Sequence, residues 1–239
     1  MGQHQKRISA PKSWSIAKKE HYWVSKTSPG PHSYERSIPL ILLVRDILNL
    51  VDNRRETRII LNEGKILLNG RVRKNEKHPV GSFDILSIPL TDTHYRVLPD
   101  SKGRMMLTKI KGEDAKDRLC KISNISIVKN GKRQLNFHDG SNILVPDEID
   151  YKATDSIILN LKDYQILGRY KFQEGSYIMV IGGKHSGEIG SIEKIRIVSS
   201  SLPNMITFKN AEGNLIETIQ DYIFVVGEKK VEINFEGIE

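Results

Sequence analysis

The stretch IGGKHSGEIGSI at residues 181–192 holds the side chains whose types and spacing most directly indicate chemistry, because four glycines surround Lys184 and His185. A glycine-rich turn that carries a cation can cradle the phosphates of a nucleotide, as in enzymes that use nucleotides. Such a turn can also approach a nucleic-acid backbone, because glycine has no side chain that keeps two backbones apart. The stretch therefore indicates either a nucleotide-dependent enzyme or a binding protein.

The spacing excludes the two common nucleotide-binding loops. A Walker-type loop needs Gly-x-x-x-x-Gly-Lys followed by Ser or Thr, whereas Ile178 stands at the place of the first glycine and His185 follows the lysine. A dinucleotide fingerprint needs Gly-x-Gly-x-x-Gly at the start of a helix, whereas these glycines are spaced differently and lie between stretches rich in β-branched residues. The pattern predicts two strands joined by a glycine turn that exposes Lys184 and His185, as in a five-stranded barrel of the SH3 type.

Other side chains that could support catalysis or bind a metal are scattered. Cys120 is the only cysteine, so the chain cannot form an internal disulfide, and we expect this thiol to be a buried apolar group. Asp139 follows His138 and precedes Gly140, and Asp-Gly is typical of a hairpin turn rather than of an acid and base pair. The seven histidines show no pair at helical metal-binding spacing. We predict no catalytic residue, no metal, no cofactor and no small-molecule substrate.

The net charge of +8 is concentrated at the front of the chain. Residues 1–37 carry seven Lys and Arg against Glu20 and Glu35, a net charge of +5, whereas residues 38–100 carry +2 and residues 101–239 carry +1. A basic arm suits a polyanion, because each neutralised phosphate releases counterions. The alternative is a solvated, disordered tail.

The arm contains aromatic residues as well as cations, which is unusual for a disordered tail. Trp14, Tyr22, Trp23 and Tyr34 are interleaved with its lysines and arginines. Their rings can stack on nucleic-acid bases beside a cation, or they can dock the arm onto its own domain, and both uses are compatible. The arm residues that we expect to bind RNA are Lys6, Arg7, Lys12, Trp14, Lys18, Lys19 and Trp23.

No segment of the sequence indicates a membrane or a secreted protein. The longest apolar run, Ile38 to Val44, contains Pro39 and stops at Arg45, far short of a membrane span. The amino terminus is polar and basic with no apolar segment behind it, so we do not expect a secretory signal. We expect a cytoplasmic protein.

Residues 38–90 indicate a small basic module. The stretch LILLVRDILNLV (40–51) has its apolar residues at helical spacing, and RRETRIILNE (54–63) predicts a second helix that begins at Asp52 or Asn53 and stops at Gly64. The second helix places three arginines on one face, which could bind a polyanion. The alternative is a helix surface on which these arginines form salt bridges with Glu56 and Glu63. An Asn-Gly pair then predicts a hairpin with a basic return strand. The residues of this module that we expect to bind RNA are Arg45, Arg54, Arg55, Arg58, Lys65, Asn69, Arg71, Arg73 and Lys74.

The module resembles the small RNA-binding domain shared by several ribosomal proteins, pseudouridine synthases and tyrosyl-tRNA synthetases. The stretch GSFDIL (81–86) looks like a variant of the closing element of that domain, with two residues inserted. The residues that match the pattern are Asn53, Arg54, Arg58, Gly64, Asn69 and Gly70.

From Ser101 onward, turn signals recur at short intervals between short apolar runs, which predicts small barrels or sandwiches. One helix is expected to interrupt them, over GEDAKDRLCKI (112–122), with Leu119 and Cys120 on its apolar side. The segment EGSYIMVIGGKHSGEIGSIEKI (174–195) resembles the KOW motif of ribosomal proteins and transcription elongation factors, a family that uses this loop to contact RNA or protein.

The order of these parts resembles one family over essentially the whole chain, the archaeal and eukaryotic ribosomal protein four of the small subunit. The chain stops soon after YIFVVGEKK, so we expect the archaeal form to be the closer likeness. The stretches that carry the resemblance are RISAPKSW (7–14), SPGPHS (28–33), SIPLILLVRDIL (37–48), DSKGRMMLTKI (100–110), EDAKDRLCKI (113–122), HDGSNILVPD (138–147) and MVIGGKHSGEIGSI (179–192).

The resemblance implies a non-enzymatic structural component of the small ribosomal subunit that binds the 5′ domain of its rRNA and neighbouring ribosomal proteins. It also implies that the arm becomes ordered only when it binds RNA. The alternatives are an RNA-modifying enzyme, for which the Arg-Leu-Asp signature of a pseudouridine synthase is absent, and a KOW-type transcription factor. We predict a multidomain α+β protein with an arm (1–37), a helix-helix-hairpin RNA-binding domain (38–100), a central β-rich domain (101–171) and an SH3-like barrel with the KOW motif (172–239).

Overall fold

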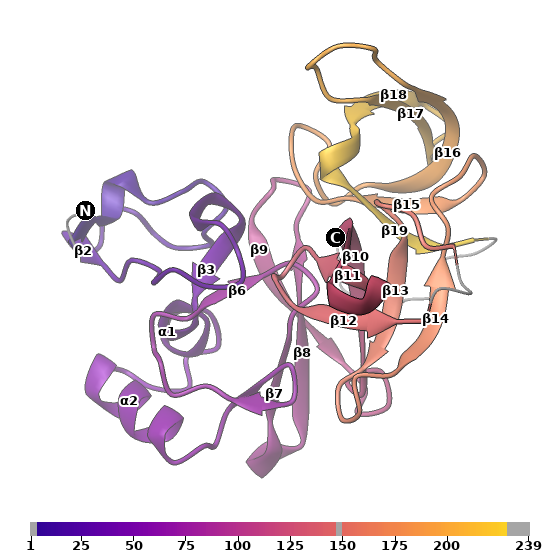
Figure 1. Ribbon diagram of the computed structural model, residues 1–239. Coiled ribbons are helices and arrows are strands. Elements are labelled where there is room, and N and C mark those ends of the chain that lie inside the picture. Colours follow the sequence, from indigo (N-terminus) through magenta and orange to yellow (C-terminus); the bar gives the residue numbers. More distant parts are fainter. Residues whose placement is uncertain (1–3, 147–149, 229–239) are drawn as a thin grey trace. The chain divides into compact units, whose positions relative to one another are not determined.

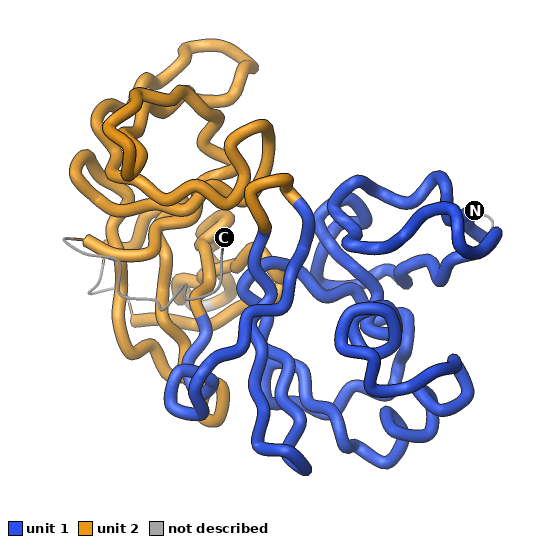
Figure 2. Tube along the Cα trace, turned by 180° about the vertical axis from the view of Figure 1, so that it is seen from behind, with its two compact units in different colours: residues 1–99, 104–118 blue, residues 100–103, 119–239 orange. Residues whose placement is uncertain are grey.

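The computed structural model describes residues 4–146 and 150–228, and it divides into two compact units (Figures 1 and 2). Unit 1 comprises residues 1–99 and 104–118, and unit 2 comprises residues 100–103 and 119–239. Strands dominate both units, and the α-helices of the described residues are confined to positions 40–62. The prediction of a β-rich chain with a small helical module near its front is therefore confirmed.

The second helix of the module forms where its sequence signals predict it. Helix α2 (Arg54–Asn62) begins after Asn53, whose side chain accepts a hydrogen bond from the backbone N–H of Glu56 at 3.0 Å. This is the usual way in which an asparagine satisfies a free N–H group in the first turn. The helix ends before Gly64, which adopts a left-handed φ of 72°.

The first helix is shorter than its apolar pattern predicts. Helix α1 (Leu40–Leu42) continues into a π-helical turn, η3 (Leu43–Ile47), and the helical segment then stops. Asn49 has a positive φ of 50°, and Leu50 lies exposed on the surface. The apolar spacing predicted a helix to Val51, but the helical segment ends before it. Val51 is still buried in the core, which it reaches from the loop that follows.

A five-stranded antiparallel sheet with the strand order β5-β4-β7-β8-β9 is the largest sheet of unit 1. Asn69 and Gly70 form the predicted tight turn between β4 and β5, with φ values of 51° and 74°. Both residues are left-handed, as a two-residue hairpin turn requires. The strands are β4 (Leu67–Leu68), β5 (Arg71–Val72), β7 (Ile85–Ile88), β8 (Thr93–Pro99) and β9 (Met105–Ile110), with a 3-10 turn, η4 (Pro89–Thr91), before β8.

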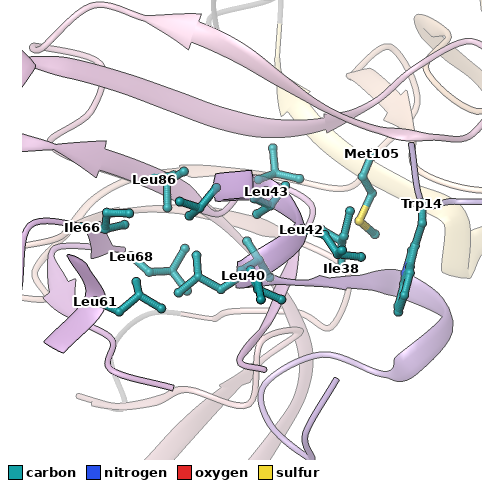
Figure 3. Close-up of a cluster of buried hydrophobic side chains, with 14 of the residues drawn as sticks. Trp14, Ile38, Leu40, Leu42, Leu43, Leu61, Ile66, Leu68, Leu86 and Met105 are labelled. Atoms are coloured by element: carbon teal, nitrogen blue, oxygen red, sulfur yellow. The ribbon is translucent and has the colours of Figure 1, made fainter. Parts of the chain in front are cut away.

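The arm packs as part of unit 1 in this structure, whereas its ordering on RNA binding stays a prediction. Trp14 is only 2% exposed, and its Nε1 donates a 2.6 Å hydrogen bond to the carbonyl oxygen of Ser37. Figure 3 shows its ring beside Met105, at one end of a group of apolar side chains that extends to Leu61. The net charge of the arm suggested a polyanion as its partner. Burial of the Trp14 indole stabilises the packed arm in this structure.

Two short ribbons hold the arm in place. Strand β1 (Gln5–Lys6) pairs with β2 (Trp23–Val24), and β3 (Ser37–Pro39) pairs with β6 (Pro79–Gly81), both antiparallel. Two 3-10 turns, η1 (Arg7–Ser9) and η2 (Tyr34–Arg36), lie next to these strands.

The fully buried carboxylate of Asp84 ties the segments of unit 1 together. Its oxygens accept hydrogen bonds from the backbone N–H of Gly81 at 2.8 Å and from Asn69 Nδ2 at 2.8 Å. They also lie 2.9 Å from His32 Nε2 and 3.2 Å from Arg118 Nη1. Burial raises the pKa of this carboxyl, but His32, Arg118 and the Gly81 amide outweigh burial and hold it well below its usual range.

Unit 2 contains two five-stranded sheets, ordered β12-β11-β10-β13-β14 and β18-β17-β16-β15-β19. The first consists of β10 (Asp117–Ile127), β11 (Arg133–Phe137), β12 (Asn142–Val145), β13 (Ser156–Asn160) and β14 (Ile166–Tyr170), with η5 (Lys129–Gly131) after β10. The second consists of β15 (Tyr177–Val180), β16 (Ile189–Arg196), β17 (Met205–Asn210), β18 (Leu215–Ile219) and β19 (Ile223–Gly227), with η6 (Gln220–Tyr222) before β19.

The predicted turn signals fall at the hairpins of the structure. Asp139 closes one of them, because its Oδ1 accepts hydrogen bonds from the N–H and hydroxyl of Ser141 at 3.1 and 2.6 Å. This confirms a turn at His138-Asp139-Gly140. The other signals are Lys102-Gly103 between β8 and β9, Asn130-Gly131 between β10 and β11, Lys162-Asp163 between β13 and β14, and Ala211-Glu212-Gly213 between β17 and β18.

The helix expected over residues 112–122 is wrong. Residues 112–116 form a single turn, in which the N–H of Ala115 bonds to the carbonyl oxygen of Lys111, and the chain then enters strand β10. Leu119, Cys120 and Ile122 are all buried there, so side chains on both faces of the strand are covered. Pairing with β11 and β13 on either side overrides the local helical preference, and Cys120 is buried as expected.

The two tryptophans of the arm provide a test of its place in the core. Replacing Trp14 with Ala should lower the free energy of unfolding by about 3–5 kcal/mol, because a large buried side chain leaves a cavity. Trp23→Ala is the matched control, because Trp23 is 55% exposed, and it should change stability by less than about 1 kcal/mol. Urea denaturation followed by far-UV circular dichroism measures both changes in stability. If both substitutions have the same small effect, the arm does not contribute to the core, and the alternative of a solvated tail holds.

The network around Asp84 predicts an acid-sensitive unit 1. A carboxyl with a lowered folded-state pKa stabilises the fold above its unfolded pKa, and this contribution is lost as the pH falls below about 4. Asp84→Asn should cost about 3–5 kcal/mol at neutral pH and should lack this part of the acid dependence. The exposed Asp92 gives the control Asp92→Asn, which should behave as wild type in the same pH series of urea melts.

Candidate nucleic-acid interface

The arginine face of α2 lies on the surface of unit 1. The side chains of Arg54, Arg55 and Arg58 are all exposed. Among the described residues, Arg55 has no hydrogen-bond or ion-pair partner. The expected cationic face therefore exists in the folded chain, and it is presented by a helix whose position is fixed by its buried residues Thr57 and Leu61.

The acid that pairs with this face is Glu76, and not Glu56 or Glu63. Glu76 Oε1 accepts from Arg54 Nε at 2.8 Å and from Arg58 Nη2 at 2.9 Å, and its Oε2 accepts from Arg58 Nε at 3.0 Å. Arg54 Nη2 also bonds to Oε1. Glu56 instead accepts from Asn53 at the start of the helix, and Glu63 pairs with Lys65.

The charge of Glu76 is stabilised by the arginines that it holds. Burial raises the pKa of this carboxyl, but hydrogen bonds from Arg54 and then Arg58 outweigh burial and lower it below its usual value. The same contact raises the pKa of Arg54. The pair of guanidinium groups therefore has one fixed counter-charge beneath it.

The hairpin beside α2 supplies further cations. Arg71 and Lys74 are exposed, and Arg73 is half-buried. Lys65 is exposed but lies 2.5 Å from Glu63, and Arg45, on η3, lies 2.8 Å from Asp46. These residues belong to the same unit as the arginine face, so the sequence-predicted cations of residues 45–74 share one folded scaffold.

The surface of the arm carries an aromatic and cationic cluster on β1 and β2. Tyr22 and Trp23 lie edge to face with ring centroids 4.7 Å apart, and both are exposed. The Nζ of Lys6 lies 5.5 Å from the Tyr22 ring centroid. Lys12 and Lys19 are exposed too, whereas Lys18 donates to the carbonyl oxygen of Ala10 at 2.7 Å.

Three of the predicted RNA-binding residues serve the fold in this structure. Arg7 is buried, where its Nε donates 2.5 Å to the carbonyl oxygen of Ala17 and its Nη2 lies 3.4 Å from both Glu20 and Asp46. Trp14 is buried as described above. Asn69 joins the hairpin turn to β7, because its Oδ1 accepts from the N–H of Ile85 at 2.8 Å. Their side chains point into the protein, so we leave them out of the interface.

The glycine turn between β15 and β16 exposes a single cation. Lys184 is exposed, and within residues 4–146 and 150–228 it has no ion-pair or hydrogen-bond partner. His185 is half-buried, with its Nδ1 2.8 Å from Glu188 Oε1. Gly187 has a left-handed φ of 83°, and a Cβ there would lie 2.9 Å from the backbone carbon of Asp100, so only glycine fits this position.

Sequence reasoning missed Glu76 and the exposure of Tyr22. A signal for Glu76 was present, because it is the single acid within a basic stretch, RVRKNEKH, that follows the hairpin turn. Its partners on α2 are far away in the chain, so only the fold could identify them.

The described part of the chain offers no metal-binding group of three or more His, Cys, Asp or Glu side chains. No helix in residues 4–146 and 150–228 is long and apolar enough to span a membrane.

Comparison with known proteins gives matches over nearly the whole chain. The family model described as "Ribosomal family S4e" matches residues 91–166, and the "RS4NT (NUC023) domain" matches residues 1–35. Among curated proteins, the small ribosomal subunit protein eS4 of Methanothermobacter thermautotrophicus is 46% identical over 98% of this chain and 96% of its own length. The eS4 protein of Archaeoglobus fulgidus is 49% identical over 95% and 94% of the two chains.

A solved structure is also similar. The crystal structure of the 30S ribosomal protein S4e from Thermoplasma acidophilum matches with a TM-score of 0.69 and 29% identity. The match covers 81% of this chain and 96% of that chain.

Proposed function

The chain belongs to the S4e family of small-subunit ribosomal proteins, and we propose that it binds the 5′ domain of the small-subunit rRNA through the cationic surface of unit 1. As a member of this family it is part of the cytoplasmic ribosome and is not an enzyme. Family membership also decides against the RNA-modifying enzyme and the transcription factor that the sequence left as alternatives.

The observation that carries the proposal is the arginine face of α2. Three guanidinium groups lie exposed on one short helix, and Glu76 keeps two of them in a defined position. Double-stranded RNA presents phosphates and 2′-hydroxyl groups in a regular array, and proteins recognise it mainly by shape. Arginines on one helix face beside a basic hairpin, two of them held in place, fit such an array.

The remaining contacts of unit 1 extend this surface. We assign the exposed Trp23 to stacking on an unpaired base, with Tyr22 and Lys6 beside it, because aromatic rings next to cations bind single-stranded RNA. The side chains that we propose for rRNA binding are Lys6, Lys12, Lys18, Lys19, Trp23, Arg45, Arg54, Arg55, Arg58, Lys65, Arg71, Arg73, Lys74, Lys184 and His185.

Unit 2 provides a second binding region in this proposal. The strand order of β15–β19, the bulge in β16 between Ile192 and Lys194, and the glycine turn support an SH3-like barrel with a KOW motif. Lys184 at this turn then adds an RNA contact far along the chain from α2, which fixes the orientation of the protein by multivalent binding. The remaining surface of the barrel is proposed to meet neighbouring ribosomal proteins.

The four-part division of the chain stays a proposal as well. The arm (1–37) and the helix-helix-hairpin segment (38–100) together supply the rRNA surface of unit 1. The barrel (172–239) supplies the second region through the turn at Lys184, and the central β segment (101–171) precedes it in the chain.

The RNA surface is tested by replacing Arg54, Arg55 and Arg58 together with Ala. We expect weaker binding to an in vitro transcript of the 5′ domain, and a plot of log K against log salt that is flatter by roughly one unit per lost phosphate contact. Filter binding between about 50 and 200 mM salt measures both quantities. Transcripts of the other rRNA domains should bind more weakly than the 5′ domain.

The matched control removes the same charge from unit 2, by replacing the exposed Lys152, Lys162 and Lys171 with Ala. This variant should lose less affinity than the arginine variant. An equal loss in both variants would mean that total charge, and not the α2 face, determines binding.

A further inference from the structure

We propose that Glu76 is a positioning residue for RNA binding, which holds the Arg54 and Arg58 guanidinium groups so that their outward N–H groups receive one RNA phosphate. This inference rests on the proposed function, because it concerns how the α2 face binds RNA. It assigns a favourable role to an acid, whose own charge repels RNA.

The contacts of Glu76 orient both guanidinium groups in the same way. Arg54 and Arg58 each direct Nε and Nη2 to the carboxylate, so each turns one edge of its fork inward. Within residues 4–146 and 150–228 these two side chains have no other hydrogen-bond or ion-pair partner, and they remain 50% and 56% exposed. The opposite edges of the two forks therefore face solvent, where a phosphate can accept from both.

The position of Glu76 is itself fixed by the fold. Its carbonyl oxygen accepts from the N–H of Ile41 at 2.9 Å, at the start of the first helix. The next residue, Lys77, accepts through its carbonyl oxygen from the N–H of Ser28 at 2.8 Å and from the Ser28 hydroxyl at 3.0 Å. The loop is thus held by α1 on one side and by the arm on the other, and Glu76 is only 5% exposed.

A carboxylate in a phosphate-binding surface lowers the net charge, so it must contribute something other than charge. Two arginines at positions 54 and 58 on one helix repel each other, and each has many rotamers when it is free. Glu76 offsets the repulsion and selects one rotamer for each side chain before RNA arrives. Binding then loses less side-chain entropy, which is the usual benefit of preorganisation.

The substitution Glu76→Gln separates positioning from charge. It raises the net charge of the protein by one, while its neutral amide has only one accepting oxygen and so cannot hold Arg54 and Arg58 as the carboxylate does. If charge alone mattered, this variant would bind the 5′-domain transcript more tightly than wild type. We expect it to bind about eightfold more weakly at 0.1 M salt, which is the loss in affinity expected from one phosphate contact. The plot of log K against log salt should be flatter by about one unit. Filter binding measures both, and tighter or unchanged binding would overturn the proposal.

Glu63→Gln is the matched control, because it removes the same charge from the end of the same helix. Glu63 is half exposed, and its side chain has an ion pair with Lys65 and no other ion-pair or hydrogen-bond partner among the described residues, so this variant should bind as tightly as wild type or more tightly. A loss equal to that of Glu76→Gln would mean that any acid near α2 has this effect, which contradicts the specific role.

A second comparison distinguishes positioning from a purely structural effect. In a variant that already carries Arg54→Ala and Arg58→Ala, adding Glu76→Gln should cause no further loss of affinity. If it weakens binding there by the same factor, Glu76 acts through the loop and not through the arginines. Urea melts of each protein show whether the fold is retained.

The variant R54K/R58K decides the question if Glu76→Gln fails to fold. Lysine keeps both charges but lacks the fork that bonds to the carboxylate and the phosphate together, so we expect a loss similar to that of Glu76→Gln. Wild-type affinity would overturn the proposal. If Arg54→Ala/Arg58→Ala binds as wild type does, the α2 site of the proposed function fails instead, which separates the two failures.

Discussion

The buried carboxylate of Asp84 is the interaction on which unit 1 depends. A buried charge is tolerated only when its oxygens have hydrogen-bond partners, and those of Asp84 come from four different parts of unit 1. His32 belongs to the arm, Asn69 to the hairpin turn, Gly81 to β6 and Arg118 to the start of β10. The arm, the hairpin and the sheet therefore cannot adopt their positions independently, and the surface that they carry is equally fixed.

The carboxylate of Glu76 obeys the same physical rule, but it has the opposite role in the structure. Its carboxylate is buried like that of Asp84, but its partners Arg54 and Arg58 remain half exposed. Asp84 uses its partners to close the interior, whereas Glu76 uses its partners to define the surface. One unit thus contains an acid that joins segments together and an acid that fixes the direction of two cations toward solvent.

Local signals in the sequence were sufficient wherever neighbouring residues determine the structure. The helix start at Asp52 or Asn53, the stop at Gly64 and the Asn69-Gly70 turn all depend on contacts within a few residues, and all three were predicted, with Asn53 as the cap that the fold uses. The helix expected over residues 112–122 failed because strand pairing with distant residues outweighs local propensity.

The candidate site could be predicted in type but not in detail. Composition identified a basic surface with aromatic residues, but it could not distinguish Trp14 from Trp23, since both stand among lysines in the same arm. The difference arises from tertiary packing, because Trp14 reaches Ser37 and the core while Trp23 lies on a two-residue strand at the surface. The role of Glu76 was hidden for the same reason.

The formal charge of the chain therefore overstates the charge that is available to a polyanion. Arg7 and Arg118 are buried against Asp46 and Asp84, so their charges are used to stabilise the fold. Arg55 and Lys184 have no acidic partner within the described residues, and their full charge faces solvent. Arg54 and Arg58 lie between these extremes, because they share one counter-charge and keep a free edge. The binding surface is thus determined less by the number of cations than by which cations the folded chain leaves without a partner of their own.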